Sequence, residues 1–461
     1  NTYAGGTKVT GGRLRFTTDA NLGAAGAGVT LEGGSIGTTA NAPANTSINR
    51  SLNLVSNGGI DVAKNALAWR GNISGAGQLI KSGDGDLLLT GNNTYSGGTL
   101  VTGGVLRFAN IARLGPAGTA IVLNGGSIGT TRETPAATQM GRNISLTGAG
   151  GGISVALHPI TWTGSISGSG QFVKSGDGEL WVTGATSYTG GTLVARGTLR
   201  VDADNKLGAA GTGVTLKDNG ALRASETFAS ARNFQLVGAP GAGGVFLVDG
   251  DKTLTLSGIV GGSGGLTKLA AGTLVLTGAN TYGGWLNING GTVQGSTSSL
   301  HGAITFDFNK NNPIARSVTF DQGTDGTYAS PISGVGSLTK TGAGKLTLSG
   351  KNNYSEGTSV LAGTLQGTTN SLQGKILNNA TVIFDQNTDG IYAGQMIGTG
   401  ALIKNGTGKV NLTGTSSVKG GTTINAGGLA VNGKLTSNVT INKGGTLRGV
   451  GNSEASITNN G

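Results

Sequence analysis

Apolar and polar residues alternate along short stretches of this chain, and glycine-rich turns separate the stretches. Leu346 and Leu348 alternate with small polar residues, and the same pattern recurs at Leu87 and Leu89, at Leu274 and Leu276, and at Val410 and Leu412. A period of two residues is typical of a strand with one buried face. Gly-Gly, Asp-Gly, Asn-Gly and Ser-Gly pairs supply the backbone conformations that sharp corners need. Because no segment shows a 3.6-residue apolar stripe of helical length, the sequence predicts an all-β protein.

The stretch from Ile332 to Gly367 is the unit that the chain repeats. Further copies begin at Ile73, Ile166, Val260 and Ile397, and an incomplete sixth copy begins the sequence. In five copies a lysine precedes an aromatic residue, or the valine that replaces it, by 14 residues, as in Lys81 and Tyr95 (95−81 = 14). These lysines are Lys81, Lys174, Lys268, Lys340 and Lys404. A constant internal register is what stacked repeats require, because each unit presents the same face to its neighbour.

The spacing of the copies separates two all-β repeat architectures. A propeller needs blades of nearly constant length, whereas these copies start between 65 and 94 residues apart (397−332 = 65, 260−166 = 94). A solenoid tolerates this drift because whole coils can be added or removed. With roughly 20–25 residues per coil, the chain forms about twenty coils, and at ~4.8 Å per coil it forms a rod on the order of 100 Å long. The crossover rule for parallel strands predicts right-handed winding.

The repeats also predict how the chain is organised. We expect a single elongated right-handed parallel β-helix over residues 1–461, with long repeat units over residues 1–300 and shorter units over residues 301–461. Pro, Asn and charged residues interrupt the strand pattern in four segments, which we expect to protrude as short loops and to be favoured places for function. These segments are Ala40–Arg50, Arg132–Asn143, Ser225–Asn233 and Phe308–Arg316.

The repeat motif GxLxKxGxGxLxLxGxNxYxGGTxVxxGTL resembles the passenger-associated transport repeat of Gram-negative autotransporter (type V secretion) passenger domains. The resemblance implies a right-handed parallel β-helix that crosses the outer membrane with the help of a C-terminal β-barrel and is then displayed at the cell surface or secreted. The sequence shows neither that barrel nor a signal peptide at Asn1, so we expect an interior part of a longer precursor. Contact with a membrane is then expected only through the missing barrel.

Composition agrees with a β-solenoid. Glycine accounts for 91 residues without a G-X-Y period, which favours tight turns and excludes collagen. Charged residues make up only 11% of the chain and cysteine is absent, so disulfide bonds play no part in the fold. No run of about 18 apolar residues occurs, so the sequence predicts no membrane-spanning helix.

Several residue patterns suggest catalysis or metal binding, and each has a simpler structural interpretation. The acidic pairs Asp84/Asp86 and Asp177/Glu179 suggest a two-carboxylate glycosidase site, but each lies in a short turn and uncharged residues replace it in the other repeats. Asp321, Asp325, Asp385 and Asp389 suggest calcium, but their segments lack the ligand spacing of known calcium loops. Neither His158 nor His301 adjoins a nucleophile motif, and His158 is expected to be a partly buried strand residue. We therefore expect no enzyme, cofactor or metal site.

The basic residues are the strongest candidate for ligand binding. Lysine and arginine exceed the acids by 32 to 21, a net charge of +11. Arg15, Arg107 and Arg200 recur every 92 or 93 residues (107−15 = 92, 200−107 = 93), and Arg13 shares a strand face with Arg15. We expect these four arginines to point to solvent and to form a lengthwise row that binds an anionic polysaccharide. The alternative is a solvated face that prevents edge-to-edge aggregation. Nucleic acid is not expected, because no aromatic residues interleave with the arginines.

The repeat lysines favour a structural role instead. Each lysine shares its strand parity with core leucines, so its stem should lie along the coil while the ammonium emerges at the corner and caps turn carbonyls. The Asn and Tyr of the repeat should likewise form stacked turn ladders.

The resemblance implies a surface-displayed or released passenger, and together with the basic residues it leads us to expect an adhesin that binds host extracellular matrix or an anionic glycan and associates with copies of itself. The alternative from a different class is a structural stalk for an enzyme or toxin whose active part lies outside these residues.

Overall fold

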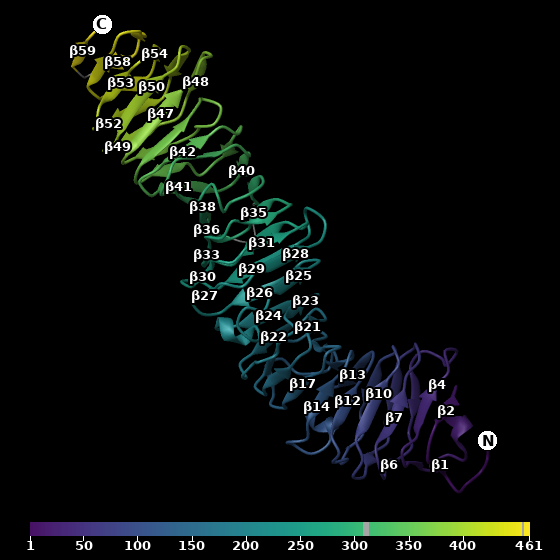
Figure 1. Ribbon diagram of the computed structural model, residues 1–461. Coiled ribbons are helices and arrows are strands. Elements are labelled where there is room, and N and C mark those ends of the chain that lie inside the picture. The colour runs from purple at the N-terminus through teal and green to yellow at the C-terminus, as the bar shows by residue number, and fades with distance from the viewer. Residues whose placement is uncertain (308–312, 454–455) are drawn as a thin grey trace. The chain divides into compact units, whose positions relative to one another are not determined.

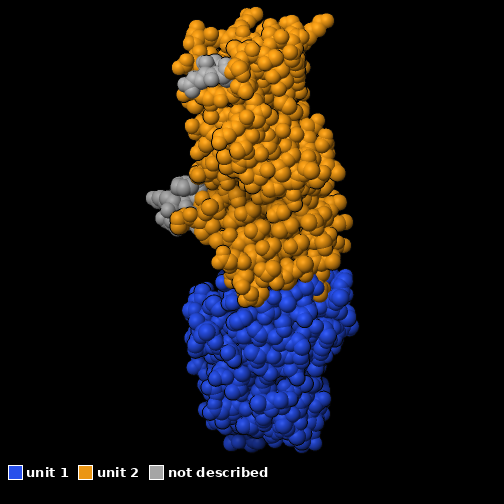
Figure 2. All heavy atoms as spheres, turned by 90° about the vertical axis from the view of Figure 1, so that its left-hand side faces the viewer, with its two compact units in different colours: residues 1–223 blue, residues 224–461 orange. Residues whose placement is uncertain are grey.

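The computed structural model describes residues 1–307, 313–453 and 456–461. The chain is an all-β parallel β-solenoid of about 22 turns, which confirms the predicted β-helix. It divides into two compact units, residues 1–223 (unit 1) and residues 224–461 (unit 2), which Figure 2 colours blue and orange. The change of repeat type that we expect at residue 300 falls inside unit 2, and the boundary predicted there stays a prediction.

Unit 1 stacks its short strands into parallel sheets (Figure 1). Its first sheet contains β2 (Arg13–Phe16), β4 (Ser35–Thr38), β7 (Gly58–Asp61), β10 (Leu79–Ser82), β12 (Thr99–Val101), β14 (Ile121–Leu123), β17 (Ile144–Leu146) and β20 (Ile166–Gly168). Its second sheet includes β5 (Thr46–Ile48), β8 (Leu67–Trp69), β11 (Leu87–Leu89), β13 (Val105–Phe108), β15 (Ser127–Thr130), β18 (Gly151–Ser154), β21 (Phe172–Ser175) and β23 (Thr192–Val194). Its third sheet includes β16 (Thr138–Met140), β19 (Ile160–Trp162), β22 (Glu179–Val182) and β24 (Thr198–Val201).

Unit 2 repeats this arrangement with its own strands. One of its sheets contains β39 (Gly326–Tyr328), β42 (Lys345–Leu348), β45 (Thr364–Gly367), β47 (Thr381–Asp385), β50 (Ala401–Asn405), β53 (Thr422–Ile424), β56 (Val439–Ile441) and β59 (Ile457–Asn459). The strands β32 (Leu266–Leu269), β35 (Leu286–Ile288) and β37 (Ile304–Phe306) also pair with one another in sequence. The described residues contain no α-helix, and the helical turns among them are the short 3-10 segments η1 (Asp19–Leu22), η2 (Ile111–Leu114) and η3 (Asp204–Lys206).

The core consists of aliphatic side chains stacked at equal positions of successive turns. Leu87 pairs in register with Leu106, Leu106 with Ile128, and Ile128 with Ile153, and all four are fully buried. Lys174 pairs next with Ile153 and is also fully buried. Burying each aliphatic side chain contributes about 1.5–3 kcal/mol, so the ladder is a main source of stability.

Candidate functional site

The four predicted arginines do not form one lengthwise row. Arg13 and Arg15 lie on β2 in the first sheet, Arg107 lies on β13 in the second sheet, and Arg200 lies on β24 in the third sheet. Equivalent arginines of successive repeats therefore occupy three different faces of unit 1. The expectation that one extended ligand contacts them in line is wrong.

The cause is the length of the repeat relative to the length of a turn. Strand register gives turns of 20 to 25 residues in this part of the chain (99−79 = 20, 152−127 = 25). Arg15 stacks on Gly37 and Gly37 on Asp61, but β13, which carries Arg107, belongs to the next sheet. Because each long repeat exceeds four whole turns, its motif moves on by one sheet.

All four arginines contact groups on neighbouring turns. Arg13 forms an ion pair with the buried carboxylate of Asp61, and Arg107 Nε lies 2.5 Å from Asp86 Oδ2. Arg15 donates to the Thr38 carbonyl at 2.8 Å. The predicted exposure is confirmed for Arg13 and Arg15 but is wrong for Arg107, which is half-buried.

Arg200 is also half-buried, and an aromatic ring holds it. Its guanidinium carbon lies 4.0 Å from the centre of the Trp181 ring, while its Nη1 lies 3.9 Å from Glu179 Oε1. The other oxygen of Glu179 accepts a hydrogen bond from Arg223 at 3.0 Å. Cation–π stacking fixes the plane of a guanidinium without using its N–H groups, so Arg200 is better placed than Arg107 to donate to an external anion.

An open groove of about 550 Å³ lies around Arg107 on unit 1. Three guanidinium groups line it, from Arg107, Arg132 and Arg196, together with the carboxylates of Glu133 and Asp177. Arg196 pairs with Asp177, whereas Arg132 is exposed and forms no hydrogen bond or ion pair with the residues that the structure describes. The groove thus brings a predicted site arginine next to the predicted loop at Arg132–Asn143.

The acidic pairs of the repeat turns serve these arginines. Asp86 binds Arg107, Asp177 binds Arg196, and Glu179 binds Arg223. The charges of Asp86, Asp177 and Glu179 are therefore engaged with cations on nearby turns, of which Arg223 lies two turns on from Glu179, and this agrees with the turn interpretation.

The repeat lysines cap turn carbonyls, as predicted, but their ammonium groups do not emerge into solvent. All five lysines are fully buried. Lys174 Nζ donates to the carbonyls of Ser175 and Gly176 at 2.9 Å and of Arg196 at 3.0 Å. The same three-carbonyl arrangement recurs at Lys81, Lys268, Lys340 and Lys404. Burial lowers the pKa of Lys174 to about 7, because the charged form loses its water.

The Asn of the repeat links successive turns, as predicted, whereas the Tyr hydroxyl binds within its own turn. Asn352 Oδ1 accepts from the Ile332 amide at 2.9 Å and Asn352 Nδ2 donates to the Ser371 carbonyl at 2.9 Å, so one side chain links three turns. Tyr354 Oη lies 2.6 Å from Thr358 Oγ1.

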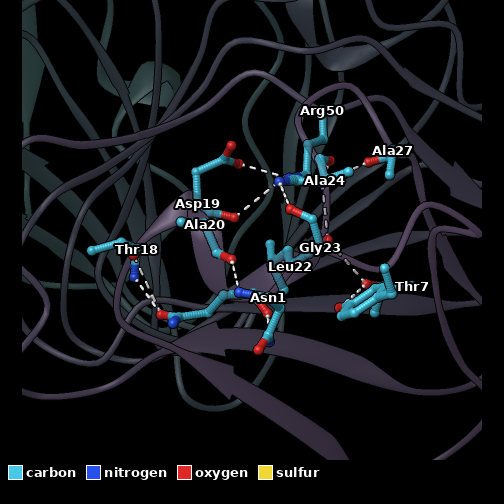
Figure 3. A network of polar contacts seen from close by, with 12 residues as sticks. Asn1, Thr7, Thr18, Asp19, Ala20, Leu22, Gly23, Ala24, Ala27 and Arg50 are labelled. Carbon is cyan, nitrogen blue, oxygen red and sulfur yellow. Dashed lines mark hydrogen bonds and ion pairs between the residues drawn. The ribbon is translucent and has the colours of Figure 1, made fainter.

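Sequence reasoning missed a set of buried arginines near the ends of the predicted loops. Arg50 is 2% exposed, and its Nε donates to Asp19 Oδ1 at 2.9 Å (Figure 3). Its two terminal nitrogens donate to the carbonyls of Asp19, Leu22, Gly23, Ala24 and Ala27. Arg142, which is 6% exposed, binds the Leu114 carbonyl in a similar way one long repeat later (142−50 = 92). The recurrence of arginine at this spacing was the available signal.

The predicted loops are shorter than expected, because each contains strand residues. Ala40–Arg50 includes β5, Arg132–Asn143 includes β16, and Ser225–Asn233 includes β27 (Phe228–Ser230). In Phe308–Arg316, residues 308–312 lie outside the described part of the chain, and Arg316 begins β38 (Arg316–Asp321). The strands β5, β16 and β27 have the sequences TSI, TQM and FAS, in which apolar and polar residues do not alternate.

The histidine and aspartate residues that suggested catalysis or metal binding lie at the surface or bind the backbone. His158 lies exposed in a bend, so its assignment as a partly buried strand residue is wrong. Asp325 and Asp389 accept from backbone amides of the next turn, at 2.9 and 2.8 Å. Among the described residues, no group of three or more His, Asp or Glu side chains is arranged to hold a metal ion. Within the same residues, no helix has the length and hydropathy needed to cross a bilayer.

Comparison with known proteins gives two matches. The family model of the passenger-associated-transport-repeat matches residues 1–16, 79–108, 172–201, 266–294, 338–366 and 402–431. The adhesin BmaC autotransporter of Brucella suis biovar 1 is 32% identical over 448 residues, a match that covers 77% of this chain and 13% of that protein. The lysine, Asn and Tyr residues described above fall largely within the matched repeats. The repeats, the parallel β-helix that they build and the similarity to this relative identify the chain as part of an autotransporter passenger, which is located at the surface of a Gram-negative bacterium or secreted by it.

Proposed function

We propose that this passenger is an adhesive protein, rather than an enzyme, and that unit 1 binds an anionic polysaccharide or the anionic glycans of a host matrix. One observation carries the proposal: the groove beside Arg107 gathers three arginines, and one of them, Arg132, is exposed and forms no close ion pair within the described residues, although the adjacent Glu133 lies within electrostatic range. Arginine offers planar donor pairs that match sulfate and carboxylate groups. The name of the Brucella relative, an adhesin, supports the adhesive part of the proposal.

The ion pairs refine which arginines should bind. Arg13 and Arg107 already bind carboxylates on adjacent turns, whereas Arg15 donates to a single carbonyl and Arg200 lies 3.9 Å from its nearest carboxylate oxygen. We therefore propose Arg15, Arg132 and Arg200 as the main contacts. Because they lie on different parts of unit 1, each should bind a separate stretch of a flexible polymer, and their contributions add through avidity.

The test is salt elution from a heparin column. Replacing Arg13, Arg15, Arg107 and Arg200 together with serine should move elution to markedly lower salt, because exposed contacts between charges are weak and screened. Adding Arg132→Ser should move it further. The matched control replaces Lys351, Lys375, Lys419 and Lys443 of unit 2, all exposed, with serine. If both quadruple variants lower the salt concentration of elution equally, net charge alone explains the retention, and a site in unit 1 is refuted.

The internal pairing of Arg13, Arg107 and Arg196 also favours a second candidate, a purely structural stalk for an enzyme or toxin located elsewhere in the precursor. If the parent protein is not retained on the heparin column and does not bind matrix glycans, the result would support the structural stalk and contradict the adhesive function.

We also propose that copies of the chain associate through unit 2. Asparagines on the outer surface, of which Asn425 is exposed and Asn405 and Asn442 are half-buried, form a ladder there: Asn425 donates to Asn405 at 2.9 Å and Asn442 donates to Asn425 at 2.8 Å. Each amide keeps a further N–H for a partner, and a second copy presents the same repeat of ~4.8 Å. Sedimentation of the parent should depend on concentration, and Asn425→Ala with Asn442→Ala should weaken that dependence. A parent that stays monomeric at high concentration would contradict the idea.

A further inference from the structure

Five of the six repeats place a glycine at the same turn position, three residues after the aromatic residue or its replacement. All five glycines have a left-handed backbone, with φ of 78° at Gly6, 82° at Gly98, 81° at Gly191, 84° at Gly357 and 88° at Gly421. The remaining repeat, in unit 2, has Trp285 three residues after Tyr282. A bulky residue cannot easily adopt that backbone, and among the described residues Trp285 is not one of those with positive φ.

The turn has therefore been rebuilt around this tryptophan. In other repeats the tyrosine hydroxyl binds a threonine four residues on, as Tyr95 binds Thr99 at 2.8 Å. Leu286 takes the place of that threonine, and the hydroxyl of Tyr282 instead accepts from the His301 amide at 3.0 Å. The repeat thus loses a recurrent hydrogen bond where it gains the indole.

Trp285 is not part of the buried core. It is 55% exposed, whereas Trp69 and Trp162 are fully buried in the core and Trp181 stacks on Arg200. From the strand register, the residues at its position on the adjacent turns are small: Gly265 on the turn before and Ala303 on the turn after. No tall side chain at these two positions covers the indole.

The surface next to the indole is polar and uncharged. Thr267, Asn287 and Thr305 pair in register on β32, β35 and β37, and each of them faces outward between buried neighbours. Thr305 Oγ1 donates to Asn287 Oδ1 at 2.5 Å, which leaves both N–H groups of the Asn287 amide available to donate to a partner. An aromatic ring beside amide and hydroxyl groups presents one apolar face and several hydrogen-bonding groups.

We propose that Trp285 is the stacking platform of a binding site for a neutral sugar. The C–H face of a pyranose ring fits flat against an indole, while its hydroxyls can bond to Asn287 and Thr305. A protein interface would be expected to extend over a larger apolar core, whereas this surface offers one ring among polar side chains. The site differs from the arginine sites of unit 1 in both its location and its ligand chemistry.

The test uses the whole chain and three neutral oligosaccharides, cellotetraose, chitotetraose and maltotetraose, as probes. Saturation-transfer NMR should detect binding of at least one probe, and the same probe should shift the tryptophan emission. Trp285→Ala should weaken binding at least tenfold and abolish the emission change, while Trp285→Tyr should retain most of the binding. The matched control is Ile391→Ala, which removes another exposed apolar side chain of unit 2, 63% exposed.

Three results would overturn the inference: no probe binds the parent, Trp285→Ala binds as the parent does, or Trp285→Ala removes concentration-dependent association instead, which would make the indole a protein contact. Circular dichroism verifies that the variants stay folded. Heparin retention is measured in parallel, and because Trp285→Ala should leave it unchanged, failure of this site is distinguishable from failure of the proposed anionic site.

Discussion

Units 1 and 2 carry different residues at the same position of the repeat. In unit 1, Arg107 forms an ion pair with Asp86 at 2.5 Å. At the equivalent position of unit 2, Gln366 Nε2 donates to Asp385 Oδ2 at 3.1 Å, a hydrogen bond from an uncharged donor. Both contacts tie adjacent turns together on the outer surface. The β-helix therefore tolerates loss of the cation there, and the arginines of unit 1 need an explanation beyond folding.

What the two units share lies inside. Lys174 of unit 1 and Lys340 of unit 2 each donate to three carbonyls, and both are fully buried. An unpaired buried carbonyl costs about 1–3 kcal/mol, so this capping is a condition of the fold. The comparison thus separates a conserved internal framework of caps from an outer surface that differs between the units.

The largest loss of stability is expected when a buried, charged side chain that binds turn carbonyls is removed. Arg50→Ala removes donors from five carbonyls and leaves Asp19 without its partner, and breaking such a buried network costs about 3–5 kcal/mol. Urea denaturation should show an early transition in unit 1, and limited proteolysis should cut near η1. The control Arg70→Ala, at an exposed position, should change stability by less than about 0.5 kcal/mol. Equal effects for the two variants would contradict the framework.

The second effect is a rise of stability with pH, which we expect in both units. Burial lowers the pKa of Lys174 and of Lys268 to about 7, from 10.5 when unfolded. Between these values the unfolded chain binds more protons than the folded chain, so stability rises with pH, by up to about 1.4 kcal/mol per pH unit for each lysine. Above about pH 10 the buried tyrosines oppose this trend, because burial raises the pKa of Tyr95 to about 12.

Urea midpoints at about pH 7.5 and about pH 9.5 test this expectation. Lys174→Met and Lys268→Met should each flatten the rise, one in each unit. A parent whose midpoint does not change between these pH values would show that the ammonium groups stay fully charged in the fold.

The contrast between framework and surface also explains what the sequence could predict. The alternation at Leu346 and Leu348 and the constant lysine position predicted the β-helix and its carbonyl caps, because both depend on local periodicity. The sheets on which Arg15, Arg107 and Arg200 lie could not be predicted. They depend on how far the length of a repeat exceeds a whole number of turns, and an error of one residue in the length of each turn accumulates over a repeat. The Arg50 network joins residues of separate turns, so no local pattern reveals it.

A third, smaller effect should distinguish the outer contacts of the units. Arg107→Gln copies the unit 2 chemistry into unit 1 and should change stability by less than about 1 kcal/mol, because the ion pair is half-exposed. Gln366→Arg makes the reverse change beside Asp385. Thermal denaturation in low and high salt should show that salt sensitivity follows the arginine: reduced in the first variant and increased in the second. A loss of several kcal/mol in either variant would mean that the outer contacts belong to the framework.

The surface arginines of unit 1 should therefore serve binding, whereas the residues at the same repeat position in unit 2 should serve only the fold. Hydrogen exchange of the whole chain, with and without a heparin octasaccharide, tests this most directly. The account predicts added protection in unit 1, at β2, at β24 and in the turn at Arg132 beside the Arg107 groove, with no change at Gln366 and its neighbours. Protection confined to unit 2, or none in unit 1 at a heparin concentration that saturates binding, would contradict it.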